Sequence, residues 1–200
     1  MTNVTVRAAL AGALLLCIAA APAAAQVDVG LKGGVNLSKF TVDPEEPGVD
    51  FPYSYGPTGG VFVTAGSGAV AAQIEALYSR KGSKVDESGT ETLFKLDYVD
   101  IPLLIRFNGA PANATTFFVN VGPTIGVNFR ARREDADGNE SDIKDEVEQI
   151  EYGLTVGVGA QVDALVIEGR YTHGLSNIPV EDGSEDIRHR TFSLLLGFAF

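Results

Sequence analysis

Two histidines are the residues in this chain with the clearest capacity for catalysis. His173 and His189 enclose a polar segment that also carries serines and carboxylates. These are Ser176, Ser184, Glu181, Asp182, Glu185 and Asp186. A serine hydroxyl becomes a nucleophile when a histidine takes its proton and a carboxylate orients that histidine. Such residues are abundant in any polar loop, so we expect no catalytic residues and no enzyme activity. A lipid-modifying enzyme stays open as an alternative.

An acidic stretch, DADGNESDIKDE, has the spacing of a calcium-binding loop. The matching positions are Asp135, Asp137, Asn139 and Glu146. A calcium loop needs glycine at its sixth position for a sharp turn, and Glu140 stands there instead. We therefore expect no metal site and no cofactor, and at most weak binding of divalent cations to acidic loops.

A third set of charged residues lies in stretches that are otherwise apolar or small. These residues are Asp28, Lys32, Glu75, Asp100, Arg106, Glu168 and Arg170. Isolated charges are costly to remove from water, so charges inside a protein pair with one another and accept hydrogen bonds. We expect a paired network that plugs the interior of the fold. The alternative is a water column around these charges, which would make the protein a narrow channel.

The elements that must position these residues are β-strands. Apolar side chains alternate with polar or small ones, as in VDVGLKGGVNLSKF, and period two is typical of strands. Eight segments show this pattern: 26–40, 56–65, 69–81, 93–107, 116–130, 151–163, 165–175 and 190–200. Most are longer than the strands of soluble domains and suit tilted transmembrane strands of about 10 residues.

The segment 93–107 contains a change of phase. Phe94, Leu96 and Tyr98 are apolar at even positions, and Val99 starts an apolar series at odd positions. A β-bulge near Tyr98–Val99 would let both halves face outward. The alternative is that 93–97 projects above the membrane.

Connections between the segments alternate in length. Short ones lie at 66–68, 108–114 and 163–164, and long polar ones at 39–55, 82–92, 131–150 and 176–189. This layout predicts an all-β fold: an eight-stranded antiparallel up-and-down transmembrane barrel with long extracellular loops and short periplasmic turns. The rival is a soluble, lipocalin-like barrel. We favour the membrane barrel, because the polar parity is too rich in glycine and threonine for a surface in water.

The first 25 residues have the features of a secretory signal. Arg7 precedes a short apolar run, and Ala23 and Ala25 have the spacing that a signal peptidase requires. Cys17 follows a leucine, which argues against lipid anchoring. We expect residues 1–25 to be cleaved and 26–200 to form the barrel domain.

Charge and hydropathy limit the partners of the mature chain. Without Arg7, 14 of the 15 basic residues remain against 26 acidic ones, a net charge of −12. Nucleic acid is therefore excluded as a partner. The mature chain also lacks an apolar run of about 18 residues, so we expect no transmembrane helix.

Four stretches resemble the PorT-like and OmpX-like small outer-membrane β-barrel proteins. They are GLKGGVNLS, LDYVDIPLLIRF, GVGAQVDALVIEGRYTHGLSNI and SLLLGFAF, which together span most of 26–200. The last stretch, with Phe198 and Phe200, resembles the signal that the barrel-assembly machinery recognises. The resemblance implies a bacterial outer-membrane location, with outer-membrane lipid and that machinery as partners.

The function expected from the sequence is structural or surface-interacting rather than enzymatic. The four long connections, with their flanking residues, carry −9 of the −12 charges. An acidic outer surface suits an extracellular partner or divalent cations. The motifs that carry the resemblance specify a fold and no catalytic signature.

Overall fold

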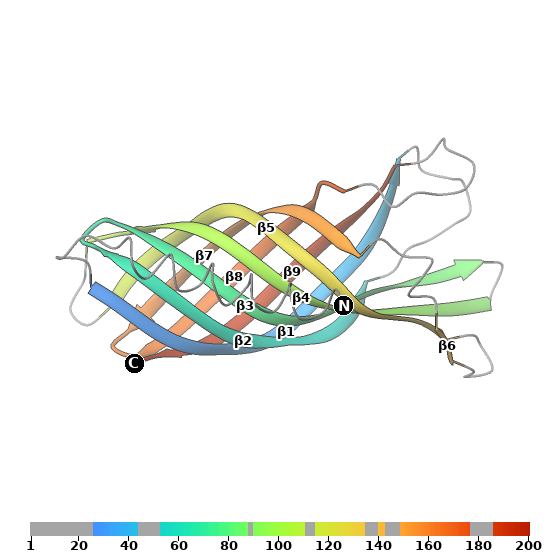
Figure 1. Cartoon of the computed structure of the whole chain (residues 1–200), viewed down its shortest axis with the longest axis horizontal. Helices are drawn as coiled ribbons and strands as arrows, with labels where there is room; N and C mark the ends of the chain where they lie inside the picture. Colours follow the sequence, from blue (N-terminus) through green and yellow to red (C-terminus); the bar gives the residue numbers. More distant parts are fainter. Residues whose placement is uncertain are drawn as a thin grey trace, which may run out of the picture.

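The barrel predicted from the sequence is present and closed. The computed structural model describes residues 26–43, 53–87, 90–110, 115–134, 140–142, 149–176 and 186–200. Eight antiparallel strands pair in chain order, and β1 also pairs with β9, which closes the barrel (Figure 1). They are β1 (Gln26–Asp43), β2 (Ser54–Ser67), β3 (Val70–Glu87), β4 (Thr90–Asn108), β5 (Thr115–Glu134), β7 (Ile150–Val162), β8 (Leu165–Gly174) and β9 (Asp186–Ala199).

A ninth strand, β6 (Glu140–Asp142), lies outside this ring. In the described part of the chain it pairs with the last three residues of β5, from Arg132 to Glu134. No helix in the described ranges is long and apolar enough to cross a membrane.

The alternation in sequence becomes an alternation between the inside and the outside of the barrel. In β1, Leu31 and Val35 are 53% and 54% exposed. Lys32 and Asn36, which directly follow them in the sequence, are 5% and 1% exposed. The polar parity therefore lines the interior, and the apolar parity covers the exterior.

The exterior carries large apolar side chains on every strand of the barrel. Examples, each at least 42% exposed, are Leu31, Val61, Val70, Ile105, Val119, Val158, Ile167 and Leu194. An apolar surface that encircles the molecule would not be tolerated in water, but it matches the hydrocarbon of a bilayer. The soluble barrel, which needs its apolar face inside, is excluded by this arrangement.

Aromatic side chains stand at both edges of this apolar belt. The extracellular edge has Tyr55, Tyr78, Phe129, Tyr152 and Tyr171, and the periplasmic edge has Phe107, Phe117, Phe198 and Phe200. Aromatic rings are common at membrane–water interfaces, so these two rows mark the limits of the spanning region.

The predicted loop at 82–92 is wrong, because this segment is a strand hairpin. β3 and β4 stay paired up to Glu87 and Thr90, so only residues 88–89 connect them. Figure 1 shows the two green strand ends running past the rest of the barrel. The pairing of β1 with β9 likewise continues to Asp43 and Asp186, so strands replace parts of the loops expected at 39–55 and 176–189.

The phase change in β4 does not come from a bulge in that strand. The register between β4 and β5 shifts between Asp97 and Tyr98, and the extra residue is Phe129 of β5. β4 itself continues without interruption, so Leu96 and Tyr98 point into the barrel and are 2% and 3% exposed. The predicted bulge at Tyr98–Val99 of β4 is therefore wrong, whereas the alternative, that 93–97 projects above the membrane, agrees with the extended β3–β4 hairpin.

The described periplasmic turns are tight. Gly68 turns the chain between β2 and β3 with a φ of 72°, in the left-handed region that glycine enters without strain. Asp163 does the same between β7 and β8 with a φ of 50°, which aspartate tolerates better than most residues.

Candidate functional site

The interior of the barrel holds a cluster of two acids and two bases. Lys32 Nζ donates to Glu75 Oε1 at 2.8 Å and to Glu168 Oε2 at 2.9 Å. Arg170 donates two hydrogen bonds to Glu75, at 2.8 and 2.9 Å, and two to Glu168, at 3.0 and 2.7 Å. We call these four residues the central cluster; its positive and negative charges balance.

The two carboxylates of the central cluster are fully enclosed. The Glu75 and Glu168 side chains have 0% exposure. Each accepts a further hydrogen bond from an amide: Gln73 donates to Glu75, and Asn120 donates to Glu168 at 3.2 Å. Such a buried arrangement is tolerated only when partners satisfy the carboxylate oxygens, as they do here.

The central cluster extends across the barrel. Lys32 comes from β1, Glu75 from β3, and Glu168 and Arg170 from β8. Gly157 of β7 leaves the space beside Glu168, because a Cβ there would lie 2.5 Å from Glu168 Oε1. Contacts between walls this far apart in the ring obstruct the lumen at this level.

A second group of charges lies nearer the extracellular end. Lys81 Nζ contacts Asp100 Oδ1 at 2.9 Å and Glu151 Oε2 at 3.4 Å. His189 Nδ1 lies 3.3 Å from Glu151 Oε1, and the Tyr98 ring covers the Lys81 ammonium at 4.5 Å. We call these five residues the outer cluster. The sequence analysis placed Asp100 in the charge network and considered His189 for catalysis, but it gave no site role to Lys81, Tyr98 or Glu151.

Neutral polar side chains fill the space between the two clusters. The Thr155 hydroxyl forms hydrogen bonds with the Thr124 hydroxyl at 2.6 Å and with the Thr172 hydroxyl at 2.9 Å. Ser193 donates to Asn36 Oδ1 at 2.7 Å. The cavity left in this layer measures only about 20 Å³, room for about one water molecule and no continuous column.

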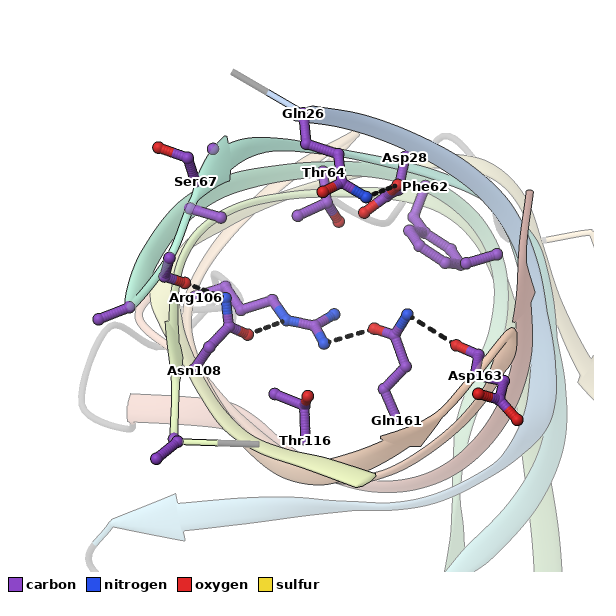
Figure 2. Close-up of a pocket in the computed structure, with 17 residues that line it drawn as sticks. Gln26, Asp28, Phe62, Thr64, Ser67, Arg106, Asn108, Thr116, Gln161 and Asp163 are labelled. Carbon is purple, nitrogen blue, oxygen red and sulfur yellow. Dashed lines mark hydrogen bonds between the residues drawn. The ribbon is translucent and has the colours of Figure 1, made fainter. Parts of the chain in front are cut away.

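The periplasmic end of the interior is open, in contrast. A cavity of about 670 Å³, which we call the vestibule, lies there. Figure 2 shows Arg106 reaching across it between Asn108 and Gln161. Arg106 Nε donates to Asn108 Oδ1 at 2.8 Å, Nη2 donates to Gln161 Oε1 at 2.7 Å, and the guanidinium stacks on Phe118 at 3.9 Å.

The structure brings together only part of the predicted charge network. Lys32, Glu75, Glu168 and Arg170 meet in the central cluster, whereas Asp100 belongs to the outer cluster. Arg106 binds amide side chains in the vestibule, and Asp28 there accepts a hydrogen bond from Gln26 at 3.2 Å. Of these three, Arg106 is joined to the central cluster through Gln73, which accepts from Arg106 Nη1 at 3.4 Å and donates to Glu75. Asp28 and Asp100 contact other partners, so the seven residues do not form one set of direct ion pairs.

An apolar floor separates the vestibule from the central cluster. It consists of Phe62, Phe118, Val166 and Ala199, all at most 9% exposed. Gly30 and Gly159 make room for the two phenylalanine rings, because a Cβ at either position would collide with a ring. The two rings thus fill space that side chains on β1 and β7 leave free.

The two histidines considered for catalysis lie on opposite faces of the barrel wall. His173 faces outward, and its Nδ1 lies 3.1 Å from the Tyr171 hydroxyl. His189 faces inward and is 4% exposed. Ser176 Oγ accepts a hydrogen bond from the Tyr152 backbone N–H at 2.8 Å. Within the described residues, no serine lies with both a histidine and a carboxylate in a triad.

Several candidate residues fall outside the described part of the chain. Glu181, Asp182, Ser184 and Glu185 do so, as do Asp135, Asp137, Asn139, Glu146 and the expected signal segment 1–25. Among the described residues, no group of three or more acids, histidines or cysteines could hold a metal ion.

The two terminal phenylalanines face the lipid side. Phe198 and Phe200 are 51% and 72% exposed, and their rings meet edge to face at 5.4 Å. The Phe200 backbone N–H donates to Val29 O at 2.7 Å, which extends the seam between β1 and β9.

Comparison with known proteins places this geometry in context. A family model described as "Outer membrane protein beta-barrel domain" matches residues 21–179. No curated protein matches the chain.

Solved structures of low sequence identity are similar to the chain. One is Ail, the attachment invasion locus protein of Yersinia pestis, in complex with the heparin analogue sucrose octasulfate: 13% identity, 88% of this chain and 99% of that chain covered, TM-score 0.47. Neisserial surface protein A has 11% identity, 88% and 99% coverage and a TM-score of 0.47. The outer membrane enzyme PagL has 11% identity, 86% and 98% coverage and a TM-score of 0.43. At such low identity, these similarities give no information about function.

Proposed function

The chain belongs to the outer membrane protein β-barrel domain family, and from that premise we propose a non-enzymatic, non-conducting barrel that acts at the cell surface. The barrel anchors the protein in the outer membrane. Its extracellular strands and acidic connections meet a partner. We further propose that it is a small barrel of the PorT-like and OmpX-like kind, and that it is exported by a signal cleaved after Ala25.

The observation that carries this proposal is the central cluster. Lys32 and Arg170 hold Glu75 and Glu168 across the lumen through contacts of 2.7–3.0 Å. An eight-stranded barrel has an interior just wide enough for side chains to fill. Since the apolar floor lies below the cluster and a packed hydroxyl layer above it, ions have no continuous path.

The extracellular side supports a role in interaction. The β3–β4 hairpin and the β5–β6 pair both extend beyond the apolar belt. Part of the chain therefore forms paired strands that are not needed to span the membrane. The connecting region 130–151 has a net charge of −5. We propose that a cationic partner or divalent cations bind there.

Planar-bilayer recordings test the closed interior. The unmodified protein, reconstituted at low copy number, should give no stepwise currents. Stable channel currents would refute the closed barrel and favour a narrow channel instead.

A binding experiment tests the surface role separately. Residues 135–148 are replaced by a Gly/Ser linker of equal length, and binding of polylysine to the reconstituted barrel is measured. We expect the replacement to reduce binding while the barrel still runs at two positions on a gel, depending on heating. Unchanged polylysine binding would contradict the proposed role of this region.

A further inference from the structure

The vestibule is a blind pocket at the periplasmic end of the barrel. Its volume of about 670 Å³ lies within the range of about 300–1,000 Å³ that is typical of small-molecule sites. The apolar floor closes it toward the central cluster, because Phe62 and Ala199 belong both to the floor and to the lining of the vestibule. A molecule that enters from the periplasm can therefore bind in the vestibule but has no path onward.

Arg106 is the one base among the described residues that line the vestibule. It is 4% exposed. Its Nε donates to Asn108 and its Nη2 to Gln161. Its Nη1 donates to Gln73 at 3.4 Å. Among the described residues, all of these acceptors are neutral amide oxygens, and none is a carboxylate.

This environment sets Arg106 apart from the two bases of the central cluster. Lys32 and Arg170 each contact two carboxylates, which neutralise their charge. Amide oxygens satisfy the donors of Arg106 but leave its positive charge uncompensated at close range. A buried charge is stabilised most by an opposite charge in contact with it. The vestibule thus holds a cation that an anionic ligand would complete.

Arg106 also has donors to spare. A guanidinium group carries five N–H groups in a planar fork. The three hydrogen bonds leave one N–H on Nη1 and one on Nη2 without a partner among the described residues. Figure 2 shows the side chain reaching into the middle of the opening rather than lying along its wall. Charge-assisted hydrogen bonds from arginine to a carboxylate are among the strongest that proteins make.

Two acids at the mouth of the vestibule limit the charge of such a ligand. Asp28 lies near the periplasmic start of β1, and Asp163 lies in the exposed turn between β7 and β8. With Arg106, they give the described lining a net charge of −1, from two acids and one base. A ligand with several negative charges would be repelled by the aspartates, whereas a single carboxylate can pass them and pair with Arg106.

The rest of the lining is mostly polar or small. Hydroxyl groups of Thr64, Ser67 and Thr116 line the vestibule together with the amide groups of Asn108 and Gln161. These groups suit a ligand that forms hydrogen bonds along its length. We propose that the vestibule binds a small hydrophilic molecule with a single carboxylate, which pairs with Arg106. The C-terminus of a short peptide and a sugar acid both have this chemistry.

This proposal concerns the periplasmic end of the barrel and does not depend on the proposed surface role. The test uses the full barrel in lipid nanodiscs, which leave both ends open to solvent, and isothermal titration calorimetry. The probes are N-acetyl-trialanine and glucuronate. The neutral controls are N-acetyl-trialanine amide and glucose. We expect at least one of the two acids to bind, and each acid that binds should do so more tightly than its neutral control. The tighter acid identifies the source as peptide or sugar.

Three variants, each first shown to be heat-modifiable on gels, locate the binding site. Arg106→Gln should weaken binding of the acids about tenfold or more, because a hydrogen bond to a charged group is lost. Lys39→Gln removes the same charge at the extracellular end, where Lys39 covers the Tyr53 ring, and should leave binding unchanged. Asp28→Asn removes a repelling carboxylate and should tighten binding by up to about fivefold.

Several results would overturn the proposal. They are no binding of either acid at millimolar concentration, neutral controls that bind as tightly as the acids, and equal affinities in Arg106→Gln and Lys39→Gln. Binding of acetate as tight as that of the larger acids would also overturn it, since the vestibule would then hold an adventitious ion only. If Arg106→Gln does not fold, weaker or unchanged binding of the acids in Asp28→Asn would still refute the proposal.

Discussion

Replacing Arg170 by alanine should be among the most damaging single changes in this barrel. The side chain donates four hydrogen bonds, two to Glu75 and two to Glu168. Without it, Lys32 alone faces two enclosed carboxylates. Breaking a buried ion pair by removing one partner costs about 3–5 kcal/mol, because the other charge stays buried and uncompensated. We expect a loss of that size in the free energy of unfolding.

The loss is measured by urea unfolding of the barrel in lipid vesicles. Unfolding is monitored by far-UV circular dichroism, because the chain has no tryptophan whose fluorescence could report it. Thr172→Ala is the matched control. Thr172 lies two residues further along β8 and makes one hydroxyl contact, with Thr155 at 2.9 Å. Its loss should cost about 1 kcal/mol.

A double variant distinguishes charge balance from packing. Arg170→Ala together with Glu75→Gln leaves one base, Lys32, and one acid, Glu168, so the cluster is neutral again. We expect the double variant to be more stable than Arg170→Ala alone. If the second substitution adds to the loss, or if Arg170→Ala costs no more than Thr172→Ala, the argument from buried charge fails.

Three further changes test other parts of the structure. Gly157→Ala should destabilise by about 1–3 kcal/mol in urea unfolding, because its Cβ would press on Glu168. Gly169→Ala, with no atom near its Cβ, should be nearly neutral. Phe200→Asp should reduce the heat-modifiable folded yield more than Phe200→Leu, because Phe200 faces lipid and leucine keeps that position apolar; equal yields would contradict this. Asp97 accepts hydrogen bonds from Arg80 Nε at 2.8 Å and from the Tyr78 hydroxyl at 2.9 Å, so Asp97→Asn should lower the free energy of unfolding at pH 7 by up to about 1 kcal/mol. Because the folded pKa of Asp97 is lowered, that difference should shrink as the pH falls below about 4, and a constant difference would refute it.

Strand number, strand parity and the lipid-facing side could be predicted from the sequence. Alternation with period two is a local property, and closure of the ring then forces one parity inside. Lys32, Glu75, Glu168 and Arg170 could be foreseen as interior charges for the same reason.

The pairing of these charges could not be predicted, because it depends on the register between strands. Asp100 contacts Lys81 rather than the central cluster, and Arg106 reaches the cluster through Gln73 rather than by a direct ion pair. Lys81 and Glu151 stand at the ends of the predicted strands 69–81 and 151–163, and the predicted network did not include them. Phe129 has no glycine beside it to signal a bulge, so sequence alone assigned the phase change to β4.

The seam between β1 and β9 has a consequence for the order of folding. Its partners, such as Gly30 and Ala199, lie at opposite ends of the described chain. Contacts this distant in sequence are slow to form, since the intervening chain must lose its freedom first. The central cluster has the same dependence, because Lys32 on β1 reaches Glu168, 136 residues away. Its charges therefore stay hydrated in any partly assembled sheet and become enclosed only when the ring closes. Closure and neutralisation of the interior are thus one cooperative step, and an unclosed sheet gains little from entering the hydrocarbon.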